Sequence, residues 1–250
     1  MTTDHIFDLS GKRALITGGG SGIGKAMAHA LSDAGASIIL VGRRKALLQE
    51  ALEGRDGMVI AADLLAAAAP QAIYDACADA GALPDIIINA AGLNPRKHAD
   101  DISPEQWQQT IQLNLNVPFF LSQIFVPHMK QNNWGRIINI ASLQSTRAFT
   151  NGIAYGASKG GVSQLTRAMA EAWSKEGINA NAIAPGFFPT ELTAAVFEND
   201  AVASHHAAMT CIGRNGGLED LTGPTIFLAS EASNYVTGQI LSVDGGYTAK

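Results

Sequence analysis

The chain has 250 residues, a length that suits one large domain or two small ones. Apolar residues make up 47% of it and charged residues 16%, which excludes intrinsic disorder and supplies enough apolar side chains for a large core. The formal net charge of −5 disfavours nucleic acid as the main partner, because binding a polyanion needs an excess of cations.

The cysteine and histidine content indicates a reducing compartment and no metal site. The two cysteines, Cys77 and Cys211, are far apart and form no CxxC motif. The six histidines show no zinc-ligand spacing. Residues 1–10 lack the basic start and apolar stretch of a secretory signal, and no apolar run approaches the ~18 residues of a membrane span. We therefore expect a cytoplasmic protein without a metal.

Short apolar runs alternate with longer helix-compatible stretches along the whole chain. Several of the runs are apolar throughout, which is typical of parallel strands that helices cover on both faces. The predicted strands are residues 14–16, 37–41, 58–61, 86–88, 137–141, 180–184 and 239–243. The predicted helices are residues 22–34, 44–52, 66–80, 104–131, 154–175 and 218–228. Because no linker divides this alternation, it predicts a single α/β domain over residues 1–250 with an open, doubly wound parallel sheet.

A glycine-rich turn joins the first predicted strand to the first predicted helix. Residues 17–24 read TGGGSGIG, and the candidate contacts in it are Gly18, Ser21, Gly22, Ile23 and Gly24. Glycines at this place let the backbone approach a pyrophosphate, and the helix N-terminus supplies N–H donors to the anion. The phosphate loop of NTPases fits less well, because Ala26 stands where Ser or Thr should reach magnesium. The turn therefore predicts a dinucleotide site.

The end of the second predicted strand indicates which dinucleotide binds. An acidic residue about 20 positions beyond the turn would bind the ribose 2′-hydroxyl of NAD, but this strand ends in Gly42, Arg43 and Arg44. Guanidinium groups are planar and always charged, which suits a 2′-phosphate. Cations at a helix start otherwise oppose the helix dipole. We therefore expect NADP(H) as the cofactor, with NAD(H) as the less favoured alternative.

The segment after the fourth predicted strand is expected at the mouth of the site. Residues 92–98 read GLNPRKH and are rich in hydrogen-bond donors, which favours a polyol or a sugar acid as substrate. Arg96 is the candidate partner for a substrate carboxylate, although its charge also suits a solvated loop. Gln144, just after the fifth predicted strand, is a further polar side chain for the substrate to contact. Phe187 is the apolar candidate, as a substrate contact or as packing of a lid.

Tyr155 and Lys159 stand four residues apart in a predicted helix, so their side chains share a face. An ammonium beside a phenol favours the phenolate and lowers the pKa of the phenol, as a general acid/base for an alcohol–ketone interconversion requires. Ser142 follows the fifth strand, at the end of the sheet where open α/β folds bind ligands. Its hydroxyl can hydrogen-bond a substrate carbonyl, so these three residues are the candidate catalytic set.

Residues 186–217 form the longest poorly patterned stretch of the chain, and we predict that this segment is a lid over the substrate. It lies between the sixth strand and the last predicted helix. Structureless stretches of this length inside a compact domain are uncommon unless they serve a site.

From about Leu9 to the C-terminus, the chain resembles the short-chain dehydrogenase/reductase family. The motifs that carry the resemblance are residues 17–24, Asp63-Leu64, residues 89–92, Asn114, Ser142, Tyr155 with Lys159, and Pro185-Gly186. Residues 89–92 read NAAG, where the family usually has NNAG. The resemblance implies a Rossmann-like single domain with a seven-stranded parallel sheet, and a homotetramer as the usual assembly.

The resemblance also implies roles for single residues. Tyr155 is then the acid/base, Lys159 lowers its pKa and binds the nicotinamide ribose, and Ser142 orients the substrate oxygen. Asn114 is implied to hold a water in a proton relay to Lys159. The further implied cofactor contacts are Asp63, Leu64, Asn89, Ala91, Gly92, Pro185, Gly186 and Thr190.

Within the family, residues 92–97, 142–145 and 185–192 look like the gluconate 5-dehydrogenase subgroup. This likeness implies NADP(H)-dependent interconversion of a secondary alcohol and a ketone on a sugar acid or polyol. The 3-oxoacyl-carrier-protein reductases share most of the same motifs and are the alternative. A catalytically idle relative that binds NADP(H) as a regulator is an alternative of another class, although Ser142, Tyr155 and Lys159 are all present.

Overall fold

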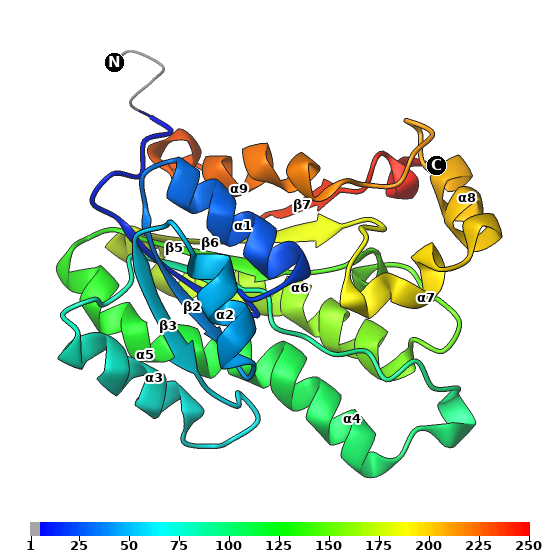
Figure 1. The fold of residues 1–250 in the computed structure, drawn as a ribbon, viewed down its shortest axis with the longest axis horizontal. Coiled ribbons are helices and arrows are strands. Elements are labelled where there is room, and N and C mark those ends of the chain that lie inside the picture. Colours follow the sequence, from blue (N-terminus) through cyan, green and yellow to red (C-terminus); the bar gives the residue numbers. More distant parts are fainter. Residues whose placement is uncertain (1–5) are drawn as a thin grey trace.

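The computed structural model describes residues 6–250 and arranges seven parallel strands in one sheet (Figure 1). The strands are β1 (Arg13–Thr17), β2 (Ser37–Gly42), β3 (Gly57–Ala61), β4 (Ile86–Asn89), β5 (Gly135–Ile140), β6 (Ile178–Pro185) and β7 (Ile240–Val243). Their order across the sheet is β3-β2-β1-β4-β5-β6-β7, so the chain changes direction between β1 and β4. The prediction of a doubly wound parallel sheet is confirmed. Residues 1–5, part of the segment in which we expected no secretory signal, lie outside the described residues.

Helices cover both faces of the sheet (Figure 1). One face carries α1 (Gly22–Asp33), α2 (Lys45–Leu52) and α9 (Thr222–Ala229), and the other carries α3 (Ala69–Asp79), α5 (Val117–Gln131) and α6 (Ile153–Trp173). Because successive side chains of a strand point to opposite faces, each strand contributes to two cores. In β1, Ile16 packs in the core with α1, and Leu15 packs in the core with α5.

The helix that we predicted over residues 104–131 is interrupted. α4 (Pro104–Ile111) starts with a capping box, in which Ser103 accepts the backbone N–H of Gln106 and the Gln106 side chain accepts that of Ser103. Gln112–Asn116 then forms a turn of π-helix before α5 begins. Pro118 explains the break, because it has no N–H to donate to the carbonyl of Asn114 four residues earlier. Such turns often occur at functional sites.

Between β6 and β7 the chain leaves the sheet and returns. Residues 186–217, which we call the lid segment, contain η5 (Glu191–Thr193), α7 (Ala194–Phe197) and α8 (Asp200–Met209). The two α-helices lie together at one end of the molecule (Figure 1). Asn199 starts α8 by accepting the backbone N–H groups of Ala201 and Val202. The sequence pattern predicted none of these short helices.

Two absences concern the described residues 6–250. None of their helices is long and apolar enough to cross a bilayer. They also contain no group of three or more His, Cys, Asp or Glu side chains that could hold a metal ion.

Candidate active site

A cavity of about 540 Å³ opens where β1, β4 and β5 end. This is the point at which the strand order reverses, and ligands of open α/β sheets bind there. The predicted site residues that line it are Gly18, Ser21, Gly22, Ile23, Gly24, Arg43, Arg44, Asp63, Leu64, Ala91, Gly92, Arg96, Ser142, Gln144, Tyr155, Lys159, Pro185, Gly186, Phe187 and Thr190. Asn89 and Asn114 lie outside its lining.

The glycine-rich turn leaves no room for a Cβ at Gly18 or Gly24. Gly18 has a φ of +69°, and a Cβ on it would lie 3.1 Å from the backbone of Ala91. A Cβ on Gly24 would lie 2.3 Å from the carbonyl oxygen of Gly18, so the turn can enter α1 in this way only with glycine. Ser21 is the N-cap of α1 and makes no side-chain hydrogen bond to its first turn. The first N–H groups of α1 are therefore available to an anion.

The two arginines after β2 have different surroundings. Nη1 and Nη2 of Arg44 donate to the two carboxylate oxygens of Glu191 at 2.9 and 2.8 Å, and Nη2 also approaches Oγ of Ser21 at 3.3 Å. Arg43 lines the same cavity and has no ion pair within residues 6–250. One predicted phosphate ligand is thus unpaired, and the other is bound to the lid segment.

Ser142 and Tyr155 bring two hydroxyl groups together on the cavity wall. Ser142 follows β5, and its Oγ accepts the backbone N–H of Gln144 at 3.1 Å, which leaves its hydrogen available for donation. Burial raises the pKa of the Tyr155 hydroxyl, while hydrogen bonding with Ser142 and the positive charge of Arg96 oppose that rise. We expected a lowered pKa, and that direction is wrong for this structure. The phenol therefore keeps its proton at neutral pH.

Lys159 lies one turn further along α6 than Tyr155. Its Nζ donates to the carbonyl oxygen of Ile140 at 2.5 Å and lies 5.6 Å from the centre of the Tyr155 ring. Burial lowers the pKa of Lys159 to about 8. The end of β5 thus fixes the ammonium group beside the phenol.

Asn114 connects two walls of the site from behind. Its Oδ1 accepts the N–H of Leu93 at 2.9 Å, and its Nδ2 donates to the Leu93 carbonyl at 2.9 Å and to Oγ of Ser158 at 3.0 Å. Ser158 donates in turn to the carbonyl of Tyr155 at 2.7 Å. These bonds join the segment after β4 to α6, so the Asn114 side chain positions the two against each other.

Asn89 is buried beneath the cavity. Its Nδ2 donates to Oδ1 of Asn139 at 2.8 Å, Oγ of Ser122 at 3.2 Å and the carbonyl of Pro118 at 3.4 Å. These bonds tie the end of β4 to β5 and α5. The neighbouring Ala91 and Gly92 line the cavity instead.

Arg96 lines the cavity and contacts the lid segment. It has a positive φ of 49°, which its backbone N–H supports by donating to Oδ1 of Asn94 at 3.1 Å. Its guanidinium donates to the carbonyl of Leu192 at 2.8 Å, which joins the segment after β4 to the lid segment. The positive charge of Arg96 opposes the rise in the pKa of the Tyr155 hydroxyl, and both residues line the same cavity.

Gln144 offers the cavity a polar atom without a partner. Its Oε1 is buried and accepts no hydrogen bond from the described residues. A Cβ on Gly152 would lie 2.1 Å from this oxygen, so the glycine leaves the room in which the amide lies. A buried acceptor without a donor is unfavourable, so this oxygen costs the fold some stability.

Phe187 lines the cavity and packs against side chains from distant segments. Its ring stacks on His206 of α8, with centroids 3.7 Å apart and planes at 19°. Phe149 and Tyr247 lie within 6.1 and 5.8 Å of it, centroid to centroid. Phe187 therefore packs on α8 within the lid segment and also lines the cavity.

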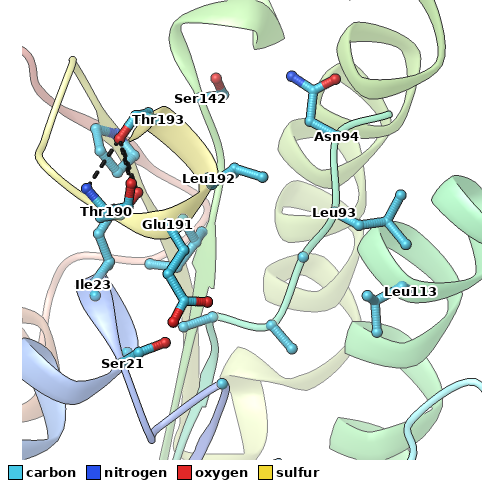
Figure 2. A pocket seen from close by; sticks show the side chains of 18 of the residues that line it. Ser21, Ile23, Leu93, Asn94, Leu113, Ser142, Thr190, Glu191, Leu192 and Thr193 are labelled. Atoms are coloured by element: carbon cyan, nitrogen blue, oxygen red, sulfur yellow. Dashed lines mark hydrogen bonds between the residues drawn. The ribbon is translucent and has the colours of Figure 1, made fainter. Parts of the chain in front are cut away.

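Glu191 and Asn94 line the cavity although they were not predicted as single residues (Figure 2). Asn94 stands within the donor-rich segment 92–98, which was the available signal. Glu191 lies 147 positions from its partner Arg44, and nothing in the local sequence indicates that pair.

Known proteins resemble the chain over nearly its full length. The family model described as enoyl-(acyl carrier protein) reductase matches residues 18–248. A 2-dehydro-3-deoxy-D-gluconate 5-dehydrogenase of Bacillus subtilis is 40% identical over 98% of this chain and 97% of that protein. A gluconate 5-dehydrogenase of Gluconobacter oxydans is 37% identical over 99% of each. The crystal structure of a gluconate 5-dehydrogenase from Burkholderia cenocepacia with NADP and tartrate has a TM-score of 0.95 and 37% identity, with both chains fully covered.

Proposed function

The chain belongs to the short-chain dehydrogenase/reductase family, and on that premise we propose that it is an NADP(H)-dependent oxidoreductase for a sugar acid or related polyol. The reaction is the interconversion of a secondary alcohol and a ketone. One observation carries the proposal: Arg96, Ser142 and Tyr155 line a single cavity. A substrate whose carboxylate binds Arg96 brings another carbon–oxygen group of the same molecule to Tyr155 and Ser142.

The residues around the cofactor end of the cavity fit a 2′-phosphorylated dinucleotide. The tight glycine turn and the free N–H groups of α1 suit a pyrophosphate, and Arg43 and Arg44 suit the 2′-phosphate. Gly42 stands where an acidic residue would favour NAD(H). When bound, the cofactor supplies or accepts the hydride.

Tyr155 is the proton donor when the reaction runs toward the alcohol. Its raised pKa keeps the proton on the phenol until the ketone oxygen gains negative charge, and Ser142 donates a hydrogen bond to the same oxygen. The ammonium of Lys159, held by the Ile140 carbonyl, stabilises the phenolate that remains. Toward the ketone, the same groups act in reverse. Gln144 also lines the cavity and is the further candidate contact for a neighbouring substrate hydroxyl.

The lid segment encloses the substrate in this proposal. Its first part lines the cavity through Phe187, Thr190 and Leu192. Arg44 and Arg96 hold it from two sides, through Glu191 and the Leu192 carbonyl. Closure over the site would exclude water from the proton transfer.

Assembly and location are part of the same proposal: a homotetramer in the cytoplasm. Large apolar side chains are exposed on three neighbouring helices, at Trp107 of α4, Phe120 of α5 and Ile153 of α6, and burial against another copy would remove them from water. The free thiols of Cys77 and Cys211 suit a reducing compartment. Light scattering of Phe120→Glu should give a smaller particle than the wild type, and an unchanged tetramer would exclude this face.

The test is the initial rate of NADPH oxidation with 5-keto-D-gluconate, with a neutral ketose and with a 3-oxoacyl thioester. We expect the highest kcat/KM for the sugar acid. A higher value for the thioester would favour a 3-oxoacyl-carrier-protein reductase. Tight NADPH binding without turnover of any of them would favour a regulator that binds the cofactor.

A further inference from the structure

The Arg44–Glu191 pair links the cofactor end of the cavity to the lid segment. Arg44 lies between β2 and α2, Glu191 is the first residue of η5, and Ser21 of the glycine-rich turn is the third member of the cluster. The side chain of Glu191 extends from the lid segment toward Ser21 (Figure 2). The carboxylate of Glu191 therefore binds the Arg44 guanidinium, a group that is also suited to binding an anionic ligand.

This ion pair is open to water. The Arg44 and Glu191 side chains are 56% and 64% exposed. Exposed ion pairs contribute little to stability because water screens them, and a two-pronged arginine–carboxylate pair is among the stronger of them. A phosphate group carries about twice the negative charge of a carboxylate and binds guanidinium with the same forked geometry. A phosphate that reaches Arg44 should therefore displace Glu191.

We propose that Glu191 is a specificity-determining residue that competes with the 2′-phosphate of the cofactor for Arg44. The inference rests on the proposed use of NADP(H). A cofactor with the phosphate must break the Arg44–Glu191 pair and leave a carboxylate near its own negative charge. A cofactor without the phosphate leaves the pair intact. Glu191 thus reduces the preference for NADP(H) over NAD(H) that Arg43 and Arg44 create.

Displacement of Glu191 also changes how the lid segment is held. η5 is bound on one side through Glu191 and on the other through the bond from Arg96 to the Leu192 carbonyl. When the phosphate takes Arg44, only the Arg96 contact of these two remains. The side of η5 that faces the substrate is then the one that stays fixed.

The experiment compares Glu191→Gln with the wild type in calorimetric titrations of 2′,5′-ADP and 5′-AMP. Glutamine keeps the shape of the side chain and removes its charge. We expect Glu191→Gln to bind 2′,5′-ADP about threefold more tightly, the factor that loss of an exposed ion pair implies, and to bind 5′-AMP as the wild type does. Glu198→Gln removes an equal charge just after α7, at its C-cap, and should change neither affinity.

A second variant tests the role of Arg44. In an Arg44→Ala background, Glu191→Gln should not increase the affinity for 2′,5′-ADP, because the guanidinium for which Glu191 and the phosphate compete is absent. A gain that persists without Arg44, an equal gain for 5′-AMP, or weaker binding of 2′,5′-ADP would overturn the inference. If the wild type binds both nucleotides equally, the proposed NADP(H) preference fails with it. If the wild type prefers 2′,5′-ADP and Glu191→Gln changes nothing, only the role of Glu191 fails.

Discussion

The Nζ of Lys159 lies 2.5 Å from the carbonyl oxygen of Ile140, so the end of β5 accepts a hydrogen bond from the ammonium that was expected to serve the phenol. Burial acts on both members of the pair in the direction of the uncharged form. It raises the pKa of Tyr155 and lowers that of Lys159 to about 8. The site therefore holds a protonated phenol beside an amine that loses its proton in mildly alkaline solution.

The lowered pKa of Lys159 makes a prediction about stability. The unfolded chain binds this proton with a pKa of about 10.4, so between pH 8 and 10.4 it holds more protons than the folded chain. Stability due to Lys159 should therefore rise with pH across that window, by about 3 kcal/mol at most. Urea unfolding of the wild type and of Lys159→Met at pH 7 to 10 gives the difference. A difference that stays constant with pH would show that Lys159 titrates normally.

Asn114 should matter for stability as well as for activity. Asn114→Ala removes three hydrogen bonds, so the half-buried N–H and carbonyl of Leu93 lose these partners and the buried Ser158 hydroxyl keeps only its bond to the Tyr155 carbonyl, at a cost of about 2 kcal/mol. Asn116→Ala in the same π-turn removes one bond, to Gln112, and should cost much less. Chemical denaturation measures both. Equal losses would mean that Asn114 does not join the segment after β4 to α6.

The fold was predictable from the sequence because its signals are local. Each strand of the parallel sheet is covered on both faces, so consecutive residues in it are apolar. Runs such as 37–41 and 86–88 are therefore recognisable as strands from the sequence. The interruption at Gln112–Asn116 was missed, although Pro118 in the middle of the predicted helix was a local signal for it. The short helices of the lid segment were missed because they bury few apolar side chains.

In the candidate site too, local patterns were predictable and contacts between residues distant in the sequence were not. Tyr155 and Lys159 were found because four-residue spacing on a helix is local, and the glycine-rich turn because its residues are contiguous. The bonds from Lys159 to Ile140 and from Arg44 to Glu191 join residues 19 and 147 positions apart. Such contacts depend on how the strands are ordered, and no local pattern records them. The direction of the Tyr155 pKa was missed for the same reason, since burial is a property of the assembled fold.

Arg43 should determine the preference for the phosphorylated cofactor. It lines the cavity without an ion pair among the described residues, so its guanidinium can bind a 2′-phosphate at no cost in broken contacts. Arg43→Ala should raise the KM for NADP(H) about tenfold and change that for NAD(H) little, as expected for one charged hydrogen bond. Lys45→Ala, an exposed neighbour outside the cavity lining, is the control. Parallel changes for both cofactors would exclude the phosphate contact.

Arg96 should distinguish acidic from neutral substrates. With Arg96→Ala, kcat/KM for a sugar acid should fall about tenfold or more, while that for a neutral polyol of the same length should change little. Lys97→Ala removes the adjacent charge, which lies outside the cavity lining, and should leave both values near those of the wild type. If Arg96→Ala lowers kcat/KM equally for the two substrates, the residue holds the lid segment through Leu192 and does not bind a carboxylate.

The catalytic role of Tyr155 is tested most directly by Tyr155→Phe, which removes one oxygen from a buried side chain. The matched control is Tyr247→Phe, since the Tyr247 hydroxyl approaches His206 and this residue lies outside the cavity lining. NADPH affinity, from fluorescence titration, should stay near the wild-type value in both variants. Single-turnover reduction should slow by a factor of about 10² to 10⁴ in Tyr155→Phe and change little in Tyr247→Phe. Tyr155→Phe that binds NADPH normally and reduces substrate at the wild-type rate would contradict the assignment.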